Sequence, residues 1–293
     1  MRKMFVEVAS EIISRDSKTV LLLGDIGVYG FRHLAAAHSN RIFNLGIAEQ
    51  SLIGVAAGMS MSGLTPIVHT IAPFLIERPL EQLKIDFGYQ RNAGNFVSVG
   101  ASYDYSKLGA THHAPADVLT LLGIPGFQIM VPGTAAEFSN LMLSNYDNGK
   151  ANYFRLSEKE NQFSIDLEIG KGKIVKHGTL ATIIVVGPLL DLVLDSYKNL
   201  DVEIIYINSV NPFDFEIIAK NCASSKILIV EPFYEGTISH LVQKAAENRP
   251  HQIQTVGINR EFITRYGEYE EISTEIGFSP GNLLSQLDKL VKS

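Results

Sequence analysis

Short runs of apolar residues alternate along this chain with segments in which the apolar residues recur every three or four positions. A run that is apolar throughout predicts a strand buried on both faces, whereas the longer period predicts a helix with one buried face. The predicted strands are residues 19–25, 65–71, 95–101, 128–132, 153–157, 180–187, 202–209, 226–232 and 254–258. Helices are predicted at 1–16, between Gly46 and Gly63, and at 73–89, 115–123 and 134–147. Strands of this kind separated by helices indicate parallel sheets that helices cover on both faces.

The alternation is interrupted once. Residues 157–172 are charged, polar and closed by glycines, a composition typical of a linker between domains. We therefore expect an α/β protein with two parallel-sheet domains, residues 1–160 and 174–293, joined by a linker at 161–173. The chain has 293 residues and is 46% hydrophobic, which is enough for two cores.

Composition and charge narrow the class of protein. A net charge of -6 and a pI near 5.8 argue against nucleic acid as a partner. The longest apolar stretch, residues 180–194, contains Gly187, Pro188 and Asp191 and is shorter than the ~20 residues that span a bilayer. The single cysteine, Cys222, excludes an internal disulfide. The N-terminal segment is an amphipathic helix and not a signal peptide. We expect a cytoplasmic protein that binds no membrane.

One carboxylate is unusually isolated. Glu49 is the only charged residue between Arg41 and Glu77, although the chain is 19% charged and those 35 residues would carry about six or seven charges at that frequency. Residues one and two helical turns further on are small or apolar, and the local sequence supplies no cation. A carboxylate in such surroundings has a raised pKa or finds a hydrogen-bond partner. That partner is a ligand, or the free amides of the first helical turn.

Other polar residues follow the predicted strands, where ligands bind in parallel sheets. Asp25 lies in GDIGVYG, but the glycine spacing is not that of a dinucleotide site, and no clear amphipathic helix opens behind it. Asp25 by itself is more typical of a turn or a helix cap. In the loop 100–117, His112 and His113 are adjacent and therefore point in different directions, which makes them poor chelators. We expect no metal site built by this chain alone. A loop histidine contacts a ligand or is solvated.

The segment IAPFLIERPLEQLK contains two further candidate site residues. Phe74 falls on the buried face of the predicted helix 73–89, so periodicity alone places it in the core. Arg78, which precedes Pro79, is interpreted as a residue of the helix surface.

Together these motifs resemble a known family. NLGIAEQ with its small-residue helix, FLIERPLEQ, GATHHAPAD and IPGFQIMVPGTAAEF are similar to the pyrimidine-binding domain of transketolases and deoxyxylulose-phosphate synthases. GTLATIIVVG, NPFDFEII, KILIVEPFYEGT and GINREFITRYGEYEEI resemble their C-terminal domain. The resemblance covers essentially the whole chain in the same order.

The resemblance implies roles for individual residues. Glu49 matches the glutamate that hydrogen-bonds N1′ of the aminopyrimidine ring of thiamin diphosphate, which activates the cofactor. Phe74 matches the aromatic residue that stacks on that ring, and Ile71 stands where many relatives have a second pocket phenylalanine. His112 matches the histidine that faces the donor substrate. Asp25 falls near an acidic residue close to the thiazolium. Glu49 and His112 are thus the implied catalytic residues.

The chain also departs from the family. Gly100, Leu108 and Val131 replace a histidine, an aspartate and an arginine that contact sugar hydroxyl and phosphate groups, and Glu77 stands where transketolases often have tyrosine. The N-terminal half of full-length relatives, whose GDG motif and asparagine hold Mg²⁺ and the diphosphate, has no counterpart here. The resemblance therefore implies the C-terminal subunit of a split transketolase. Its partner would be a separate diphosphate-binding subunit, in a heterotetramer that acts on sugars or sugar phosphates.

Two alternatives stay open at this point. The chain could be the beta subunit of the decarboxylating component of a 2-oxo acid dehydrogenase, which shares the two-domain plan. It could also be a non-catalytic partner subunit, although the presence of Glu49, Phe74 and His112 together argues against this.

Overall fold

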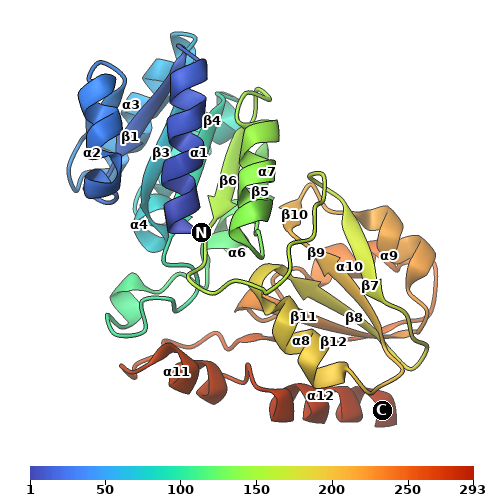
Figure 1. Cartoon of the computed structure of the whole chain (residues 1–293). Coiled ribbons are helices and arrows are strands. Elements are labelled where there is room, and N and C mark those ends of the chain that lie inside the picture. The colour runs from blue at the N-terminus through green and yellow to red at the C-terminus, as the bar shows by residue number, and fades with distance from the viewer.

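A computed structural model describes residues 1–293, which fold around two sheets (Figure 1). The first is seven-stranded with the order β10-β5-β6-β4-β3-β1-β2. Its strands are β1 Thr19–Leu23, β2 Ile42–Asn44, β3 Thr65–Ile71, β4 Gly94–Val99, β5 Phe127–Met130, β6 Ala151–Arg155 and β10 Ser209–Asn211. All neighbours pair in parallel except β10, which is antiparallel to β5.

The second sheet is five-stranded with the order β12-β11-β8-β9-β7. Its strands are β7 Gly172–Lys176, β8 Thr182–Val186, β9 Glu203–Ile207, β11 Lys226–Tyr234 and β12 Gln252–Ile258. Only β7, at one edge, pairs antiparallel. Two sheets that are mostly parallel confirm the predicted α/β class, and each has one antiparallel edge strand that the pattern of apolar runs did not predict.

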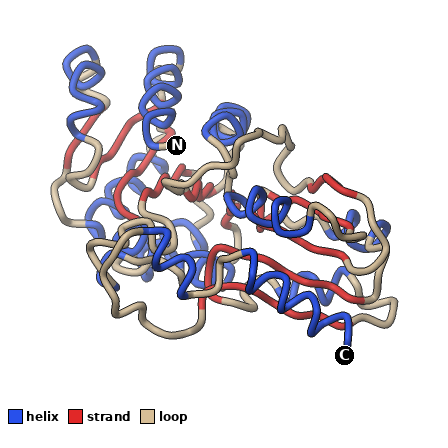
Figure 2. Tube along the Cα trace, turned by 60° about the horizontal axis from the view of Figure 1, so that its bottom comes forward, coloured by secondary structure: helices blue, strands red, loops and turns tan.

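Helices cover both faces of the first sheet (Figures 1 and 2). The buried residues of α1 (Arg2–Arg15), α2 (Val28–Ala37) and α7 (Ala135–Asn145) share one core on one face. The other face packs against α3 Glu49–Met61, α4 Ala72–Ile76, the π-helix η1 Leu83–Tyr89 and α6 Asp117–Leu122. The one-turn helix α5 Leu80–Gln82, which has no buried residue, leads into η1. A short 3₁₀ turn, η2 (Ala110–His112), lies in the loop after β4.

The helices of the second half are η3 Gly187–Leu189, α8 Leu190–Tyr197, α9 Phe215–Asn221, α10 Ser239–Ala245, α11 Tyr269–Glu275 and α12 Pro280–Lys292. Buried residues of α8, α11 and α12 form a core on one face of the second sheet. None of the helices in the structure has both the length and the apolar character that a membrane crossing requires.

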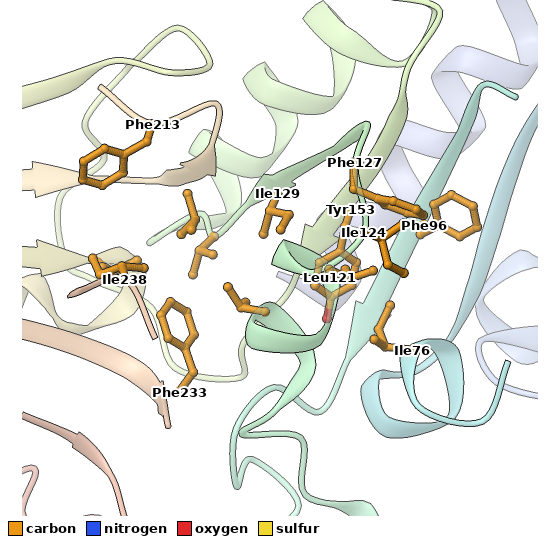
Figure 3. Close-up of a cluster of buried hydrophobic side chains, with 14 of the residues drawn as sticks. Ile76, Phe96, Leu121, Ile124, Phe127, Ile129, Tyr153, Phe213, Phe233 and Ile238 are labelled. Carbon is orange, nitrogen blue, oxygen red and sulfur yellow. The ribbon is translucent and has the colours of Figure 1, made fainter. Parts of the chain in front are cut away.

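One hydrophobic core runs from the first sheet into the second. Figure 3 shows Ile76, Phe96 and Leu121 of the first half and Phe213, Phe233 and Ile238 of the second half within this cluster. The strand β10 adds a second connection, because Ser209 and Asn211 pair with β5 across the predicted domain boundary. The predicted linker, 161–173, lacks regular structure until β7 begins at Gly172.

One prediction about helices was wrong. The helix predicted at 73–89 is broken: α4 ends at Ile76, and a new turn starts after Pro79, whose nitrogen carries no hydrogen to donate within a helix. A helix without a clear amphipathic pattern, α2, begins inside GDIGVYG after Gly27, whose φ of 80° suits glycine. Its periodicity is weak because Phe31 is its only buried residue.

Candidate functional site

Four loops converge at the carboxyl edge of the first sheet. β1 pairs with β2 and β3, with Leu23 opposite Asn44 on one side and His69 on the other. β3 in turn pairs with β4, so that Ile71 lies opposite Val99. Because these strands are parallel, the segments that follow them emerge at the same edge. These segments carry Asp25, Glu49, Phe74 and His112.

Glu49 is the first residue of α3, and only 2% of its surface is exposed. Both carboxylate oxygens accept a hydrogen bond from Nη1 of Arg78, at 3.0 and 3.1 Å. No backbone amide bonds the carboxylate, so the interpretation that free amides of the first turn satisfy it is wrong. The buried charge is balanced by an arginine 29 residues further along the chain.

Arg78 stacks on an aromatic ring at the same time. Its guanidinium carbon lies 3.7 Å from the centroid of the Phe74 ring, and 41% of its side chain is exposed. The interpretation of Arg78 as only a residue of the helix surface was therefore wrong. The local sequence supplies no cation, as predicted, and the fold brings this one from 29 residues away. The spacing of four residues between Phe74 and Arg78 would have suggested their contact. The pairing with Glu49 depends on the packing of α3 against the segment after α4, which no local pattern reveals.

His112 lies on the other side of Phe74. Their ring centroids are 5.2 Å apart with an interplanar angle of 68°, an edge-to-face contact. Nδ1 of the half-buried His112 lies 3.0 Å from the hydroxyl of Thr111, which leaves Nε2 free for another partner. The structure thus joins Glu49, Arg78, Phe74 and His112 in one continuous series of contacts.

Ile71 and Gly100 form the wall beside these residues. Ile71, at the end of β3, is 7% exposed. Gly100 has a φ of 75°, and a Cβ added there would lie 2.5 Å from the ring of Tyr105 and 3.2 Å from Ile71. Tyr105 therefore occupies the space that a side chain at position 100 would need. It also lies edge-on to His112, at 6.4 Å between centroids, and sequence reasoning did not single it out.

Asp25 is exposed and is held by Asn44. The amide of Asp25 donates to Oδ1 of Asn44 at 3.0 Å, and Nδ2 of Asn44 donates to the Asp25 carboxylate at 3.0 Å. Asn44 Oδ1 also accepts the amide of Gly46 at 3.2 Å. With a φ of 60°, Asp25 is a turn residue, and it is not the cap of α2. Asn44, which our sequence reasoning missed, ties this turn to the loop that leads to Glu49.

The adjacent histidines point in different directions, as predicted. His113 is buried, neither ring nitrogen has a hydrogen-bond partner, and burial lowers its pKa. It lines a cavity of about 270 Å³ between the two halves, together with Glu77, Tyr234 and Glu261. Burial raises the pKa of Glu77. No group of three or more His, Cys, Asp or Glu side chains is arranged to hold a metal ion.

Comparisons with known proteins show which family the chain is similar to. The family model of the transketolase pyrimidine-binding domain matches residues 1–162. An "uncharacterized 33.6 kDa protein in fasciation locus" of Rhodococcoides fascians is 36% identical over 263 residues, which are 88% of this chain and 83% of that protein. A protein of Phocaeicola vulgatus, the B subunit of an apulose-4-phosphate transketolase, is 27% identical and aligns with 99% of this chain and 97% of its own length.

A solved structure supports the fold. It is described as a split gene transketolase, inactive beta4 tetramer, and it superimposes with a TM-score of 0.87 at 24% identity, covering 99% of this chain and 97% of its own. The two chains therefore share one fold over nearly their whole length. The chain belongs to the transketolase family, whose pyrimidine-binding domain model its first half matches.

Proposed function

We propose that this chain is the C-terminal subunit of a split, thiamin diphosphate-dependent enzyme that transfers a two-carbon ketol unit between sugars or sugar phosphates. One observation carries the proposal: the Arg78 side chain contacts both the buried carboxylate of Glu49 and the face of the Phe74 ring, so these two groups border the same space. A hydrogen-bond acceptor beside an aromatic face suits a flat heterocycle with a donor at its edge.

The residues present fit an aminopyrimidine ring. The guanidinium of Arg78 is itself flat and rich in N–H donors, and it meets Glu49 with its edge and Phe74 with its face. In our proposal Glu49 binds the ring nitrogen N1′, Phe74 stacks on the ring, and Ile71 contributes an apolar wall. When bound, thiamin diphosphate supplies a carbon nucleophile that adds to the carbonyl of the donor substrate.

His112 is proposed to move a proton at the substrate. Its imidazole lies edge-on to Phe74, and the Thr111 hydroxyl partners its Nδ1. Nε2 is then available to a hydroxyl of the donor. An imidazole with one oriented nitrogen is a common general acid or base. Asp25 stands at the outer rim of the same edge, where Asn44 holds it.

A second subunit is proposed to complete the site. The turn after β1 reads GDI, and no diphosphate motif of the GDG type occurs in the chain. A partner is therefore proposed to hold the diphosphate and Mg²⁺, in a heterotetramer. The relative from Phocaeicola vulgatus is named as one subunit of its enzyme, and the similar solved structure is described as an inactive tetramer of beta chains, which supports a need for the partner.

The test is reconstitution with a co-expressed chain that carries the diphosphate motif. Calorimetric titration with thiamin diphosphate and Mg²⁺ should show tight binding by the complex and little by the isolated chain. Tight binding by the isolated chain would contradict the split site. The complex should convert ketose donors with an aldose acceptor. Consumption of a 2-oxo acid with a lipoyl-bearing partner would instead favour the dehydrogenase alternative, and inactivity with all donors would favour a non-catalytic subunit.

A further inference from the structure

The side chain of Arg78 occupies the space that the proposed function gives to the aminopyrimidine ring. Nη1 donates to both oxygens of Glu49, and the guanidinium carbon lies 3.7 Å above the centre of the Phe74 ring. In the proposed function the aminopyrimidine ring needs the same two contacts, a hydrogen bond with Glu49 and stacking on Phe74. A heterocycle bonded to Glu49 and stacked on Phe74 cannot coexist with Arg78 in this place, because two groups cannot fill the same volume.

The backbone of Arg78 is held while its side chain is free to leave. Its amide donates to the carbonyl of Pro73 at 3.4 Å, and its carbonyl accepts from Nε2 of Gln50 at 3.3 Å. The next residue, Pro79, restricts the backbone further. By contrast, 41% of the side chain is exposed, so the guanidinium can rotate into water without disturbing the core.

We propose that Arg78 is a built-in occupant of the cofactor site. In the free chain it neutralises Glu49 and covers Phe74, and the cofactor binds only by displacing it. This inference rests on the proposed function, because it takes the aminopyrimidine ring as the competitor. The ion pair keeps a buried carboxylate satisfied in the unassembled subunit, where an unpaired charge would be costly. It also lowers cofactor affinity, which favours loading only when a partner subunit holds the diphosphate at the same time.

The competition predicts that removal of Arg78 tightens cofactor binding. In the assembled complex, Arg78→Ala should lower the Kd for thiamin diphosphate in the presence of Mg²⁺ by up to about fivefold, the upper end of the range for a partly exposed ion pair. Isothermal calorimetry measures this directly, without reference to turnover. Arg15→Ala is the matched control, since Arg15 makes an exposed ion pair with Glu11 on α1, and its Kd should equal that of the wild type.

The outcomes separate the two proposals. An unchanged or raised Kd in Arg78→Ala, with normal binding by the wild-type complex, would overturn the inference and leave the proposed function standing. Absence of binding by the wild-type complex would overturn both. Should Arg78→Ala fail to fold, a crystal structure of the wild-type complex with cofactor decides: Arg78 should have left Glu49, and a retained bond between them would refute the displacement.

Discussion

At the scale of single residues, the site is defined by how one buried charge is satisfied. Glu49 has no charged neighbour in its own segment, and the fold supplies Arg78 from the segment after α4. Because the Arg78 side chain is partly exposed to solvent, the ion pair adds only modestly to the stability of the fold. The same acid that needs a cation in the free chain is proposed to bind a heterocycle in the assembled enzyme.

Replacement of the Glu49 carboxylate should abolish turnover. In the reconstituted complex, Glu49→Gln keeps the shape but not the charge, and we expect kcat to fall by several orders of magnitude. Steady-state assays with a ketose donor measure the loss. Glu11→Gln, on the exposed face of α1, should behave as the wild type. Turnover by Glu49→Gln within a few fold of the wild type would remove Glu49 from the mechanism.

A second buried residue, His69, should make the free energy of unfolding depend on pH. His69 is fully buried, Nδ1 lies 2.7 Å from the carbonyl of Val97, and desolvation lowers its pKa to about 4. Below pH ~6.5 the unfolded chain binds a proton at this residue that the folded chain does not bind until about pH 4. Acidification between these values therefore favours unfolding.

The contribution of His69 can be isolated by substitution. His69→Phe keeps a ring against Phe5, 4.6 Å away between centroids, but cannot bind a proton. Its free energy of unfolding should depend less on pH between about 6.5 and 4, by up to about 1.4 kcal/mol per pH unit. Urea unfolding of both proteins at several pH values tests this. Equal slopes would show that His69 does not titrate differently on folding.

At the scale of elements, breaks and turns place the site residues. α4 ends at Ile76 and carries Phe74, and the turn between α4 and Pro79 places Arg78 against both Phe74 and Glu49, the first residue of α3. The turn at Gly100 brings Tyr105 against Ile71 and leaves room for no side chain at position 100. Tyr105 therefore fills the space that a side chain at position 100 would occupy.

This packing predicts a cost for any side chain at position 100. Gly100→Ala would suffer both a left-handed backbone and overlap with the Tyr105 ring. Gly149, with a φ of 72° and nothing within 4 Å of an added Cβ, isolates the backbone effect. We expect Gly149→Ala to lose about 1 kcal/mol of unfolding free energy and Gly100→Ala about 1 to 3 kcal/mol more. Chemical denaturation measures both, and equal losses would mean that Tyr105 moves aside freely.

At the scale of the whole molecule, a buried ion pair and a shared core join the two halves. Arg155 at the end of β6 donates from Nε to Asp117 at 2.7 Å, and both side chains are at most 1% exposed. Nη2 of Arg155 donates to the hydroxyl of Ser102 at 3.0 Å and to the carbonyl of Pro232, in the second half, at 3.4 Å. The site loop, which lies between Ser102 and Asp117, is therefore anchored at both ends to this junction.

Breaking the junction should destabilise the molecule strongly. Arg155→Met leaves Asp117 buried without its cation, and we expect a loss of about 3 to 5 kcal/mol in unfolding free energy. Adding Asp117→Asn should restore part of the loss, because the unpaired charge is removed. Arg265→Met, which breaks an exposed pair with Glu275, should change stability by less than about 0.5 kcal/mol. A similar small change in Arg155→Met would contradict the structural role of the pair.

The sequence by itself determined the features that local patterns encode. Apolar runs marked the strands, and β3 has the predicted bounds, Thr65–Ile71, because the whole strand is buried and only Thr65, His69 and Thr70 interrupt its apolar residues. The absence of charge around Glu49 marked it as buried, and the structure shows it 2% exposed. The order of motifs indicated the family. Each of these inferences uses only the identity and the order of residues along the chain.

Only the tertiary structure decided which distant groups meet. Arg78 bonds Glu49, which lies 29 positions earlier in the chain. Asn44 bonds Asp25, 19 positions earlier, and β10 pairs with β5, about 80 positions earlier. The edge strands β7 and β10 are antiparallel because of where the chain returns, and no apolar period encodes that. The partner of a buried charge and the direction of an edge strand depend on how helices and strands pack together. The period of apolar residues, and the burial that it predicts, can be read within a single helix or strand.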